Sequence, residues 1–363
     1  MIPRIFEPTE KDFKTLGLGS LSDMLECTVT EERNGDFTLE AEYPTAGVNV
    51  DQIKINRVIL AAASDGNIQP FDLYDVRRSL KSNSIKLYGR HVSYRLNGMI
   101  YLKTTNSYTG AAGLMASFES NVPYDGRQGG SERLNIGFTF GTDVTSSHAF
   151  TISENKRIRD ILLNDEGSIL DVCGGEYEFN MFDVFLHENR GKDNGTSIRY
   201  GKNLLELDYE IDQTDHFNGH QPHWGSGSDY VRNNTAYWDA SVLPYPYIEN
   251  WDVTKLYDTK PTSAQLQTLA QSKAGADQDP DINIKVKIAD LRNGSEYEAF
   301  KELEQINLCD TVHIYDDYDG IYATAKVVKT VYDSLNEKYI DIEIGSIKST
   351  LADKIAGSGS GYR

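Results

Sequence analysis

Alternation of apolar and polar positions is the clearest pattern in the chain. Apolar residues stand at every second position from Phe37 to Tyr43 until Pro44 ends the run, so their side chains share one face of a strand. A second strand is expected at residues 26–31, just before it. Between the two, Asn34 and Gly35 are expected to supply the two positive φ angles of a tight turn. The pattern predicts a β-hairpin.

Similar runs predict strands along most of the chain. In the N-terminal part they lie at residues 57–62, 71–78 and 84–88. With no helical period between them, residues 1–95 are expected to form a small all-β barrel or sandwich. Later strands are expected at residues 176–180, 183–186, 197–200, 204–211, 282–288, 311–315, 322–332 and 338–344.

Helical spacing of apolar residues is confined to a few segments. It predicts helices over residues 110–120, from about Ser153 and over 262–273, and a capping box predicts another over 295–305. The segment 212–228 is polar and rich in Gly, His and Asp, and is predicted to be a long loop. The fold class is therefore α+β, mostly β, in a multidomain chain.

Composition narrows the function. The 363 residues include 36 Lys plus Arg and 55 Asp plus Glu, a formal net charge of −19. A protein that binds nucleic acid or an anionic membrane through its overall charge is expected to be basic, so both classes are disfavoured. The longest apolar run, from Val58 to Ala63, is far shorter than the roughly 20 residues of a membrane helix. No secretory signal is recognised at the start.

The three cysteines, Cys27, Cys173 and Cys309, are widely separated and odd in number. This arrangement favours buried thiols in a reducing compartment over a disulfide framework. We therefore expect the chain to fold in a cytoplasm.

Several short motifs together resemble one protein family. They are Glu31-Glu-Arg-Asn-Gly-Asp-Phe-Thr-Leu-Glu-Ala-Glu-Tyr-Pro44, Leu87-Tyr-Gly-Arg-His-Val-Ser-Tyr94, Gly167-Ser-Ile-Leu-Asp171, Gly174-Gly-Glu176, Asn194-Gly-Thr-Ser-Ile-Arg-Tyr-Gly-Lys-Asn203, Leu308-Cys-Asp-Thr-Val312 and Ile344-Gly345. In order and spacing they resemble the phage minor structural proteins that form the hub of siphophage and prophage tails. This family is also called the tail-associated lysin N-terminal region or prophage tail endopeptidase, and its fold is similar to the myophage baseplate hub. One departure is Cys309, where the family leads us to expect glycine.

The resemblance implies a domain arrangement and an assembly. Two hub β-barrels are expected, one of residues 1–95 and one of 195–230 with 308–347. Peripheral α+β domains are expected at 96–194, as an insertion, and at 231–307, and a C-terminal helix with a flexible Gly/Ser tail at 348–363. Three chains would then form a trimeric ring with pseudo-sixfold symmetry.

The same resemblance implies the protein's surroundings. The expected partners are two further copies, the distal tail protein or tail tube, the tape measure protein, and DNA that passes without specific binding. The expected location is the virion tail tip, after assembly in the cytoplasm of a bacterial host. Because DNA slides past a wall of like charge, the channel is expected to be neutral or negative.

Catalytic and metal-binding chemistry is weakly indicated. His216, His220 and His223 could approach a zinc ion, but Pro222 and the neighbouring glycines argue against one helix face, and a solvated loop is favoured. No nucleophile elbow or catalytic Cys–His context is present, so the chain is not expected to be an enzyme and no cofactor is expected.

Two other functions were weighed against the structural one: a cell-wall-degrading tail endopeptidase or lysin, and a module that binds wall saccharides. The 22 tyrosines, with clusters at Tyr237-Trp238 and Tyr245-Pro-Tyr247, bear on the second. These rings could stack on sugars, but half-buried strands and subunit contacts are the favoured interpretation. The function that the sequence favours is a structural hub that joins the tail tube to the tail tip and forms a channel for DNA ejection.

Overall fold

The protein is described here by a computed structural model. It describes residues 1–63, 68–79, 81–126, 130–165, 167–199, 204–212, 217–240, 244–257, 259–273, 281–288, 306–316 and 321–345. Two compact units are present. Unit 1 consists of Met1–Asp208 and Ile284–Ser346, and unit 2 is built around Tyr209–Asn283. The predicted helix at 295–305 and the C-terminal segment 348–363 lie outside the described residues.

The predicted N-terminal hairpin is confirmed. Strands β3 (Glu26–Glu32) and β4 (Phe37–Pro44) are antiparallel, with Val29 opposite Leu39. The turn differs from the prediction, because only Asn34 has a positive φ, of 55°, and Gly35 does not. The backbone N–H of Glu32 donates to the carbonyl oxygen of Asp36 (2.7 Å), so the loop spans three residues and needs one left-handed position rather than two.

Thirteen of the described strands form one sheet. Besides the hairpin they are β1 (Arg4–Phe6), β2 (Gly19–Ser20), β5 (Val58–Ala62), β6 (Ile68–Ser79), β7 (Ser84–His91), β15 (Asp193–Arg199), β16 (Leu204–Asp212), β21 (Asp281–Ile288), β22 (Thr311–Asp316), β23 (Ile321–Asp333) and β24 (Lys338–Gly345). The order is β16-β21-β24-β23-β3-β4-β7-β6-β5-β1-β2, and β22 joins β15 to β23. The strands expected from alternation are thus present in this sheet, except those at 176–180 and 183–186, which belong to another sheet.

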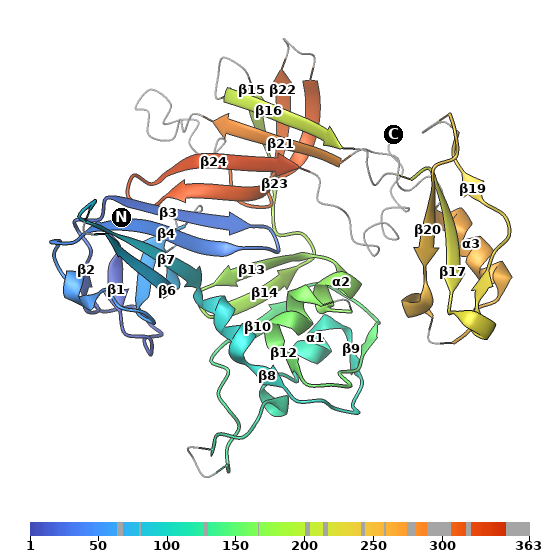
Figure 1. Ribbon diagram of the computed structural model, residues 1–363, viewed down its shortest axis with the longest axis horizontal. Helices are drawn as coiled ribbons and strands as arrows, with labels where there is room; N and C mark the ends of the chain where they lie inside the picture. The colour runs from blue at the N-terminus through green and yellow to red at the C-terminus, as the bar shows by residue number, and fades with distance from the viewer. Residues whose placement is uncertain are drawn as a thin grey trace. The chain divides into compact units, whose positions relative to one another are not determined.

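The sheet connects the two ends of the sequence. Strand β23 pairs with β3, with Val331 opposite Thr30, so the red strands β23 and β24 lie beside the blue hairpin in Figure 1. Among the described strands no sheet closes into a barrel. The prediction of two closed barrels is wrong for this part of the chain, because the free edge of β3 pairs with β23 instead of closing on its own end of the chain.

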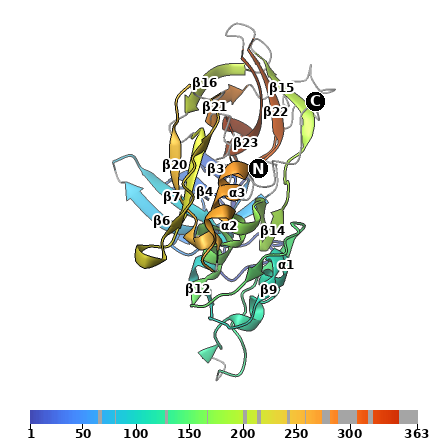
Figure 2. The same ribbon diagram turned by 90° about the vertical axis from the view of Figure 1, so that its right-hand side faces the viewer.

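Short helices and strands of residues 100–187 pack against this sheet. They are β8 (Ile100–Tyr101), β9 (Tyr108–Thr109), α1 (Gly110–Met115), β10 (Thr139–Thr142), β11 (Ala149–Phe150), β12 (Lys156–Arg157), the π-helix η5 (Asp160–Asn164), α2 (Ile169–Cys173), β13 (Glu176–Asn180) and β14 (Asp183–His187). Figures 1 and 2 show α1, β9 and β12 grouped at one end of unit 1, away from β15 and β22. We call residues 100–187 the inserted segment. The predicted helix over 110–120 is confirmed in its first half only.

One hydrophobic core is shared by the sheet and the inserted segment. The same cluster of buried side chains includes Leu39 and Phe71 of the sheet and Phe118 and Leu186 of the inserted segment. Each of these four side chains is 0–1% exposed. Because the cluster is continuous, the two parts of unit 1 exclude water together and are held in one arrangement.

Unit 2 is a small sheet packed on one helix. Strands β17 (Gly219–Trp224), β18 (Val231–Arg232), β19 (Tyr237–Trp238) and β20 (Ile248–Asp252) form the sheet, and α3 (Ser263–Lys273) covers it, as Figure 1 shows. The predicted helix over 262–273 is confirmed.

The predicted loop over 212–228 is wrong for Gly219–Trp224, because these residues form β17 at the centre of the sheet. It pairs with β19 on one edge and with β20 on the other. Within the described part of the chain, no helix has the length and apolar character needed to cross a membrane.

Candidate functional site at a buried polar seam

The side chain of Asn34 joins the loop of the β3–β4 hairpin to β13. Its Nδ2 donates to the carbonyl oxygen of Gly175 (2.9 Å), and its Oδ1 accepts the backbone N–H of Tyr177 (2.8 Å). The left-handed conformation of Asn34 is one that asparagine tolerates better than most residues. The residue therefore serves the turn and the contact to the inserted segment together.

A buried carboxylate lies beside this contact. The Glu176 side chain is 2% exposed, and its Oε1 lies 2.7 Å from Lys326 Nζ and 3.1 Å from Arg33 Nε. Its Oε2 accepts the backbone N–H of Arg190 (2.7 Å). Burial favours the neutral acid, but the hydrogen bond from Lys326 and the charges of both cations outweigh it and lower the pKa of Glu176. The ionised carboxylate thus links the hairpin loop, β13 and β23.

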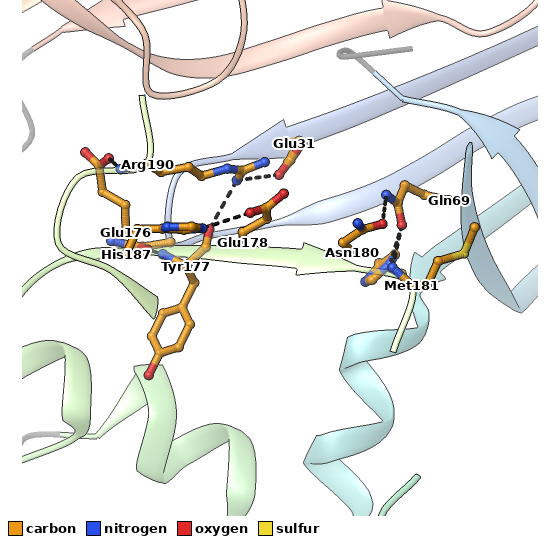
Figure 3. Close-up of polar contacts among 12 residues, drawn as sticks. Glu31, Gln69, Glu176, Tyr177, Glu178, Asn180, Met181, His187 and Arg190 are labelled. Atoms are coloured by element: carbon orange, nitrogen blue, oxygen red, sulfur yellow. Dashed lines mark hydrogen bonds and ion pairs between the residues drawn. The ribbon is translucent and has the colours of Figure 1, made fainter. Parts of the chain in front are cut away.

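A second ion pair follows the same line of contact. Arg190 Nη1 lies 2.8 Å from Glu31 Oε1 and donates to the carbonyl oxygen of Tyr177 (3.1 Å), as Figure 3 shows. Burial works against the charged form of Arg190, but the Glu31 carboxylate outweighs it and raises the pKa of Arg190. We call the following six residues the polar seam: Glu31, Arg33, Asn34, Glu176, Arg190 and Lys326.

The turn before β22 lies against the segment that follows Arg190. Cys309 is buried with φ 72°, a conformation that favours glycine and explains why glycine is expected there. A Cβ at Gly191 would lie 1.8 Å from the carbonyl oxygen of Cys309, so the two backbones touch. Asp310 Oδ1 accepts the N–H of Lys192 (2.8 Å) and fixes the approach.

His91, at the end of β7, occupies a second buried position beside the inserted segment. Its ring is fully buried and stacks on Phe37 with 4.5 Å between ring centroids, and its Nδ1 accepts the N–H of Ser93 (3.3 Å). Burial is the main cause that lowers the pKa of His91 to about 3, and the charges of Arg159 and Arg95 act in the same direction. The ring is therefore neutral near pH 7.

Gln69 connects His91 to the turn between β13 and β14. Its Oε1 lies 3.3 Å from His91 Nε2 and accepts the N–H of Met181 (2.8 Å), and its Nε2 donates to Asn180 Oδ1 (3.0 Å). Figure 3 shows this contact and the Arg190 contact at opposite ends of β13. Strand β13 is thus attached to the sheet at both ends.

A buried cation completes the contact with the hairpin. The Arg159 guanidinium lies 4.0 Å from the centroid of the Tyr94 ring, and its Nη2 donates to the carbonyl oxygen of Gly35 (3.4 Å). The Tyr94 hydroxyl donates to Asp36 Oδ1 (2.7 Å). Desolvation is the main cause that lowers the pKa of Arg159, and the ring face provides part of the stabilisation that water would otherwise give.

The two histidine candidates that the structure describes, His220 and His223, do not converge. His216 lies outside the described residues. His220 and His223 are three positions apart on β17, so their side chains point to opposite faces. His220 Nδ1 lies 2.8 Å from Glu249 Oε2, whereas His223 lies beside the Tyr230 ring. In the described ranges, no three His, Cys, Asp or Glu side chains form a group suited to a metal ion.

The cysteines are all free thiols. Cys27 and Cys309 are buried, as predicted, and Cys173 is half-buried. Burial raises the pKa of Cys27 to about 12 and that of Cys309 to about 12, so both thiols stay protonated and unreactive near pH 7.

The polar seam was not predicted as a site, yet four of its six residues belong to the motifs that carried the family resemblance, all except Arg190 and Lys326. Glu31, Arg33 and Asn34 come from the first motif, and Glu176 from Gly174-Gly-Glu176. Cys309 comes from Leu308-Cys-Asp-Thr-Val312, and Tyr94 with His91 from the motif that ends β7. The sequence did carry a signal for this site, namely motifs far apart in the chain that are rich in Gly, Asn and charged residues. Nothing in the local structure expected for these motifs explains their charges.

Comparison with known proteins finds prophage tail proteins. Residues 192–355 match the model of the prophage endopeptidase tail family. The fold is similar to prophage tail protein gp18 from Listeria monocytogenes EGD-e, with 12% identity, coverage of 98% of each chain and a TM-score of 0.62. It is also similar to a tail protein from Neisseria meningitidis MC58, with 11% identity, coverage of 97% of this chain and 98% of that chain, and a TM-score of 0.59.

A third similar structure is the 43 kDa tail protein of prophage MuSo2 from Shewanella oneidensis. It has 11% identity, coverage of 88% of this chain and 92% of that chain, and a TM-score of 0.59. No curated protein sequence matches the chain. The predicted resemblance to prophage tail proteins is confirmed, and at these identities the structural likeness concerns the fold.

Proposed function

We propose that the chain is a structural hub of a phage-type tail, in which three copies form a ring that joins the tail tube to the tail tip. The observation that carries this proposal is the end-to-end likeness of the fold to tail proteins, together with the prophage tail match over residues 192–355. The pseudo-sixfold arrangement of two related stretches per chain, 1–95 and 195–230 with 308–347, belongs to the same proposal. The proposed ring does not require either stretch to close into a barrel.

The polar seam suits this role because it holds the sheet and the inserted segment of unit 1 together as one rigid body. Two buried acidic groups, Glu31 and Glu176, meet three cations at the junction of the hairpin, β13 and β23. Breaking such a pair leaves an uncompensated buried charge, which costs about 3–5 kcal/mol. The inserted segment therefore keeps its orientation to the sheet while neighbouring tail proteins bind.

The exposed face of the sheet supports contact between copies. On this face Glu26, Glu40 and Glu42 of β3 and β4 form an acidic group, and Lys86 and Arg90 of β7 form a basic one. Strand β6 carries both signs, because Arg77 Nη2 pairs with Asp75 Oδ2 of the same strand (2.6 Å). Glu42 stands opposite Lys86 at the border between the two groups. A surface with one acidic and one basic side suits a head-to-tail contact, and head-to-tail contacts that close generate rings.

The other parts of the proposal concern the surroundings of the ring. We place it at the virion tail tip, assembled in the host cytoplasm, next to the distal tail protein or tail tube and the tape measure protein. DNA would pass through a neutral or negative channel without specific binding. The role is structural rather than enzymatic.

Sedimentation of the purified chain over a concentration series tests the contact. A trimer should form, and Glu40→Lys with Glu42→Lys should weaken its association by about tenfold, because like charges would meet. The matched control is Glu119→Lys with Glu132→Lys, which makes the same charge change on exposed residues of the inserted segment. Adding Lys86→Glu and Arg90→Glu to the first variant should restore association. Equal association of the test variant and the control would refute the proposed contact.

A further inference from the structure

A hollow on unit 2 combines aromatic and hydrogen-bonding side chains. It measures about 280 Å³ and is lined by Tyr237, Trp238, Asp239, Ala240 and Gln271. Small-molecule sites are commonly about 300–1,000 Å³, so this hollow has room for one small ligand or one unit of a larger one.

The aromatic side chains near the hollow are exposed, which is unusual for side chains of this size. Trp238 is 39% exposed, Tyr245 57% and Tyr247 42%, and Phe217 stacks on Tyr247 with 5.0 Å between ring centroids. Exposed aromatic clusters on a folded unit indicate a binding surface more often than chance. These exposed rings suit contact with a ligand or with another subunit, and subunit contact is one of the interpretations that the sequence favours.

One buried side chain holds the two flanks of this surface together. Asn218 Nδ2 donates to the carbonyl oxygens of Asp239 (3.1 Å) and Tyr245 (2.9 Å), and Asn218 Oδ1 accepts the N–H of Tyr247 (2.7 Å). Asn218 is 3% exposed. The backbones that carry Trp238 and the two tyrosines are thus fixed at a short distance from one another before any ligand binds, which lowers the entropic cost of binding.

The helix side of the hollow is fixed as well. Gln267 Nε2 donates to the Tyr237 hydroxyl (2.6 Å), which ties β19 to α3. One turn further along α3, the exposed amide of Gln271 reaches the hollow and offers both a donor and an acceptor. Asp239 also lines the hollow.

We propose that this hollow binds a neutral saccharide. A sugar ring has an apolar C–H face that packs on an aromatic ring, and hydroxyl groups at its rim that pair with carboxylate and amide side chains. Among the described residues that line the hollow none is Lys or Arg and one is Asp239, a composition that disfavours the phosphates of a nucleic acid. The site is separate from the ring contact proposed above and does not depend on it.

The test is binding of the full-length chain to an array of neutral glucose, galactose and N-acetylglucosamine oligosaccharides, followed by titration of the best of these by calorimetry. Binding to at least one oligosaccharide is expected. Trp238→Ala should weaken it by about tenfold or more, through loss of the stacking surface. Gln271→Ala, on the exposed face of a helix, should weaken it several-fold without affecting folding.

The matched control is Tyr230→Ala, which removes an aromatic ring of similar exposure (45%) in the same unit but outside the hollow. Its affinity should stay within about twofold of the parent chain. No binding to any oligosaccharide, or equal affinities of the Gln271→Ala variant and the parent chain, would overturn the proposal. A change of sedimenting mass in the Trp238→Ala variant, with no saccharide binding by the parent chain, would assign the surface to protein contact instead.

Discussion

The polar seam of unit 1 and the aromatic hollow of unit 2 both depart from the usual pattern of apolar side chains inside and charged side chains outside. The seam buries charges, and the hollow exposes a large apolar ring. In the seam, Glu176 and Arg190 are buried, and each charge has a partner of opposite sign. In unit 2, Trp238 of the hollow and Tyr245 are large and exposed, at 39% and 57%. A buried charge and an exposed aromatic cluster are the two informative deviations on a protein surface. The first holds unit 1 together, and the second leaves unit 2 with surface for a ligand.

The two units can be followed separately in solution. All three tryptophans, Trp224, Trp238 and Trp251, belong to unit 2. Tryptophan fluorescence therefore reports on unit 2, whereas far-ultraviolet circular dichroism is dominated by the larger unit 1. The predictions below use this difference.

The largest effect is expected from Glu176→Ala. It would leave Arg33 and Lys326 without their shared carboxylate in a buried setting, and should lower the free energy of unfolding of unit 1 by about 3–5 kcal/mol. Urea unfolding followed by circular dichroism measures the change. The control is Glu178→Ala, which removes a half-exposed partner of His187 and should cost at most about 1 kcal/mol. Similar losses for both variants would refute the role given to Glu176.

Asn34→Ala should follow in size. It removes two hydrogen bonds between the hairpin loop and β13 and places alanine at φ 55°, for an expected cost of about 2–3 kcal/mol. Asn34→Gly separates the causes, because glycine accepts this φ and loses only the hydrogen bonds. If the glycine variant were as stable as the parent, the contact to β13 would contribute nothing.

His91 should make stability depend on pH. Its pKa in the folded protein is about 3, below the ordinary value of 6.5, so between these values the unfolded chain binds a proton that the folded chain does not. The stability is fully present above pH 6.5 and falls by up to about 1.4 kcal/mol per pH unit as the pH drops toward 3. Unfolding at pH 6.5 and pH 5 measures a loss of about 1–2 kcal/mol, before most carboxylates titrate. A His91→Gln variant with the same slope would contradict the assignment.

The smallest effect is expected at Tyr245 of unit 2. Tyr245 is 57% exposed, so Tyr245→Ala should change the free energy of unfolding of unit 2 by about 0.5 kcal/mol or less. Unfolding followed by tryptophan fluorescence measures it. A loss above 2 kcal/mol would mean that this ring stabilises unit 2 rather than serving as a surface for binding.

The sequence predicts a structural element of this protein well when the contacts that form the element lie close together in the chain. The run from Phe37 to Tyr43 carries its own period, so β4 was predictable from its own residues. Strand β17 was not, because its polar residues are buried only through pairing with β19 and β20, and His220 meets Glu249 29 residues away. Asn34 was recognised as a turn residue, but its partner Gly175 lies 141 residues further on.

The sequence also could not predict which strand would pair with the edge of the N-terminal hairpin. Alternation defines which face of β3 is buried, but it says nothing about which strand occupies the free edge. Pairing with β23 therefore replaced the expected barrel closure. The expected glycine at position 309 proved informative, since Cys309 adopts the left-handed φ that glycine accepts most easily.

The ring is the central claim, and electron microscopy of the purified chain tests it most directly. At a concentration where sedimentation gives three chains per particle, class averages should show a threefold ring with an opening at its centre. Particles of one or two chains at every concentration, or a trimer with no central opening, would contradict the account.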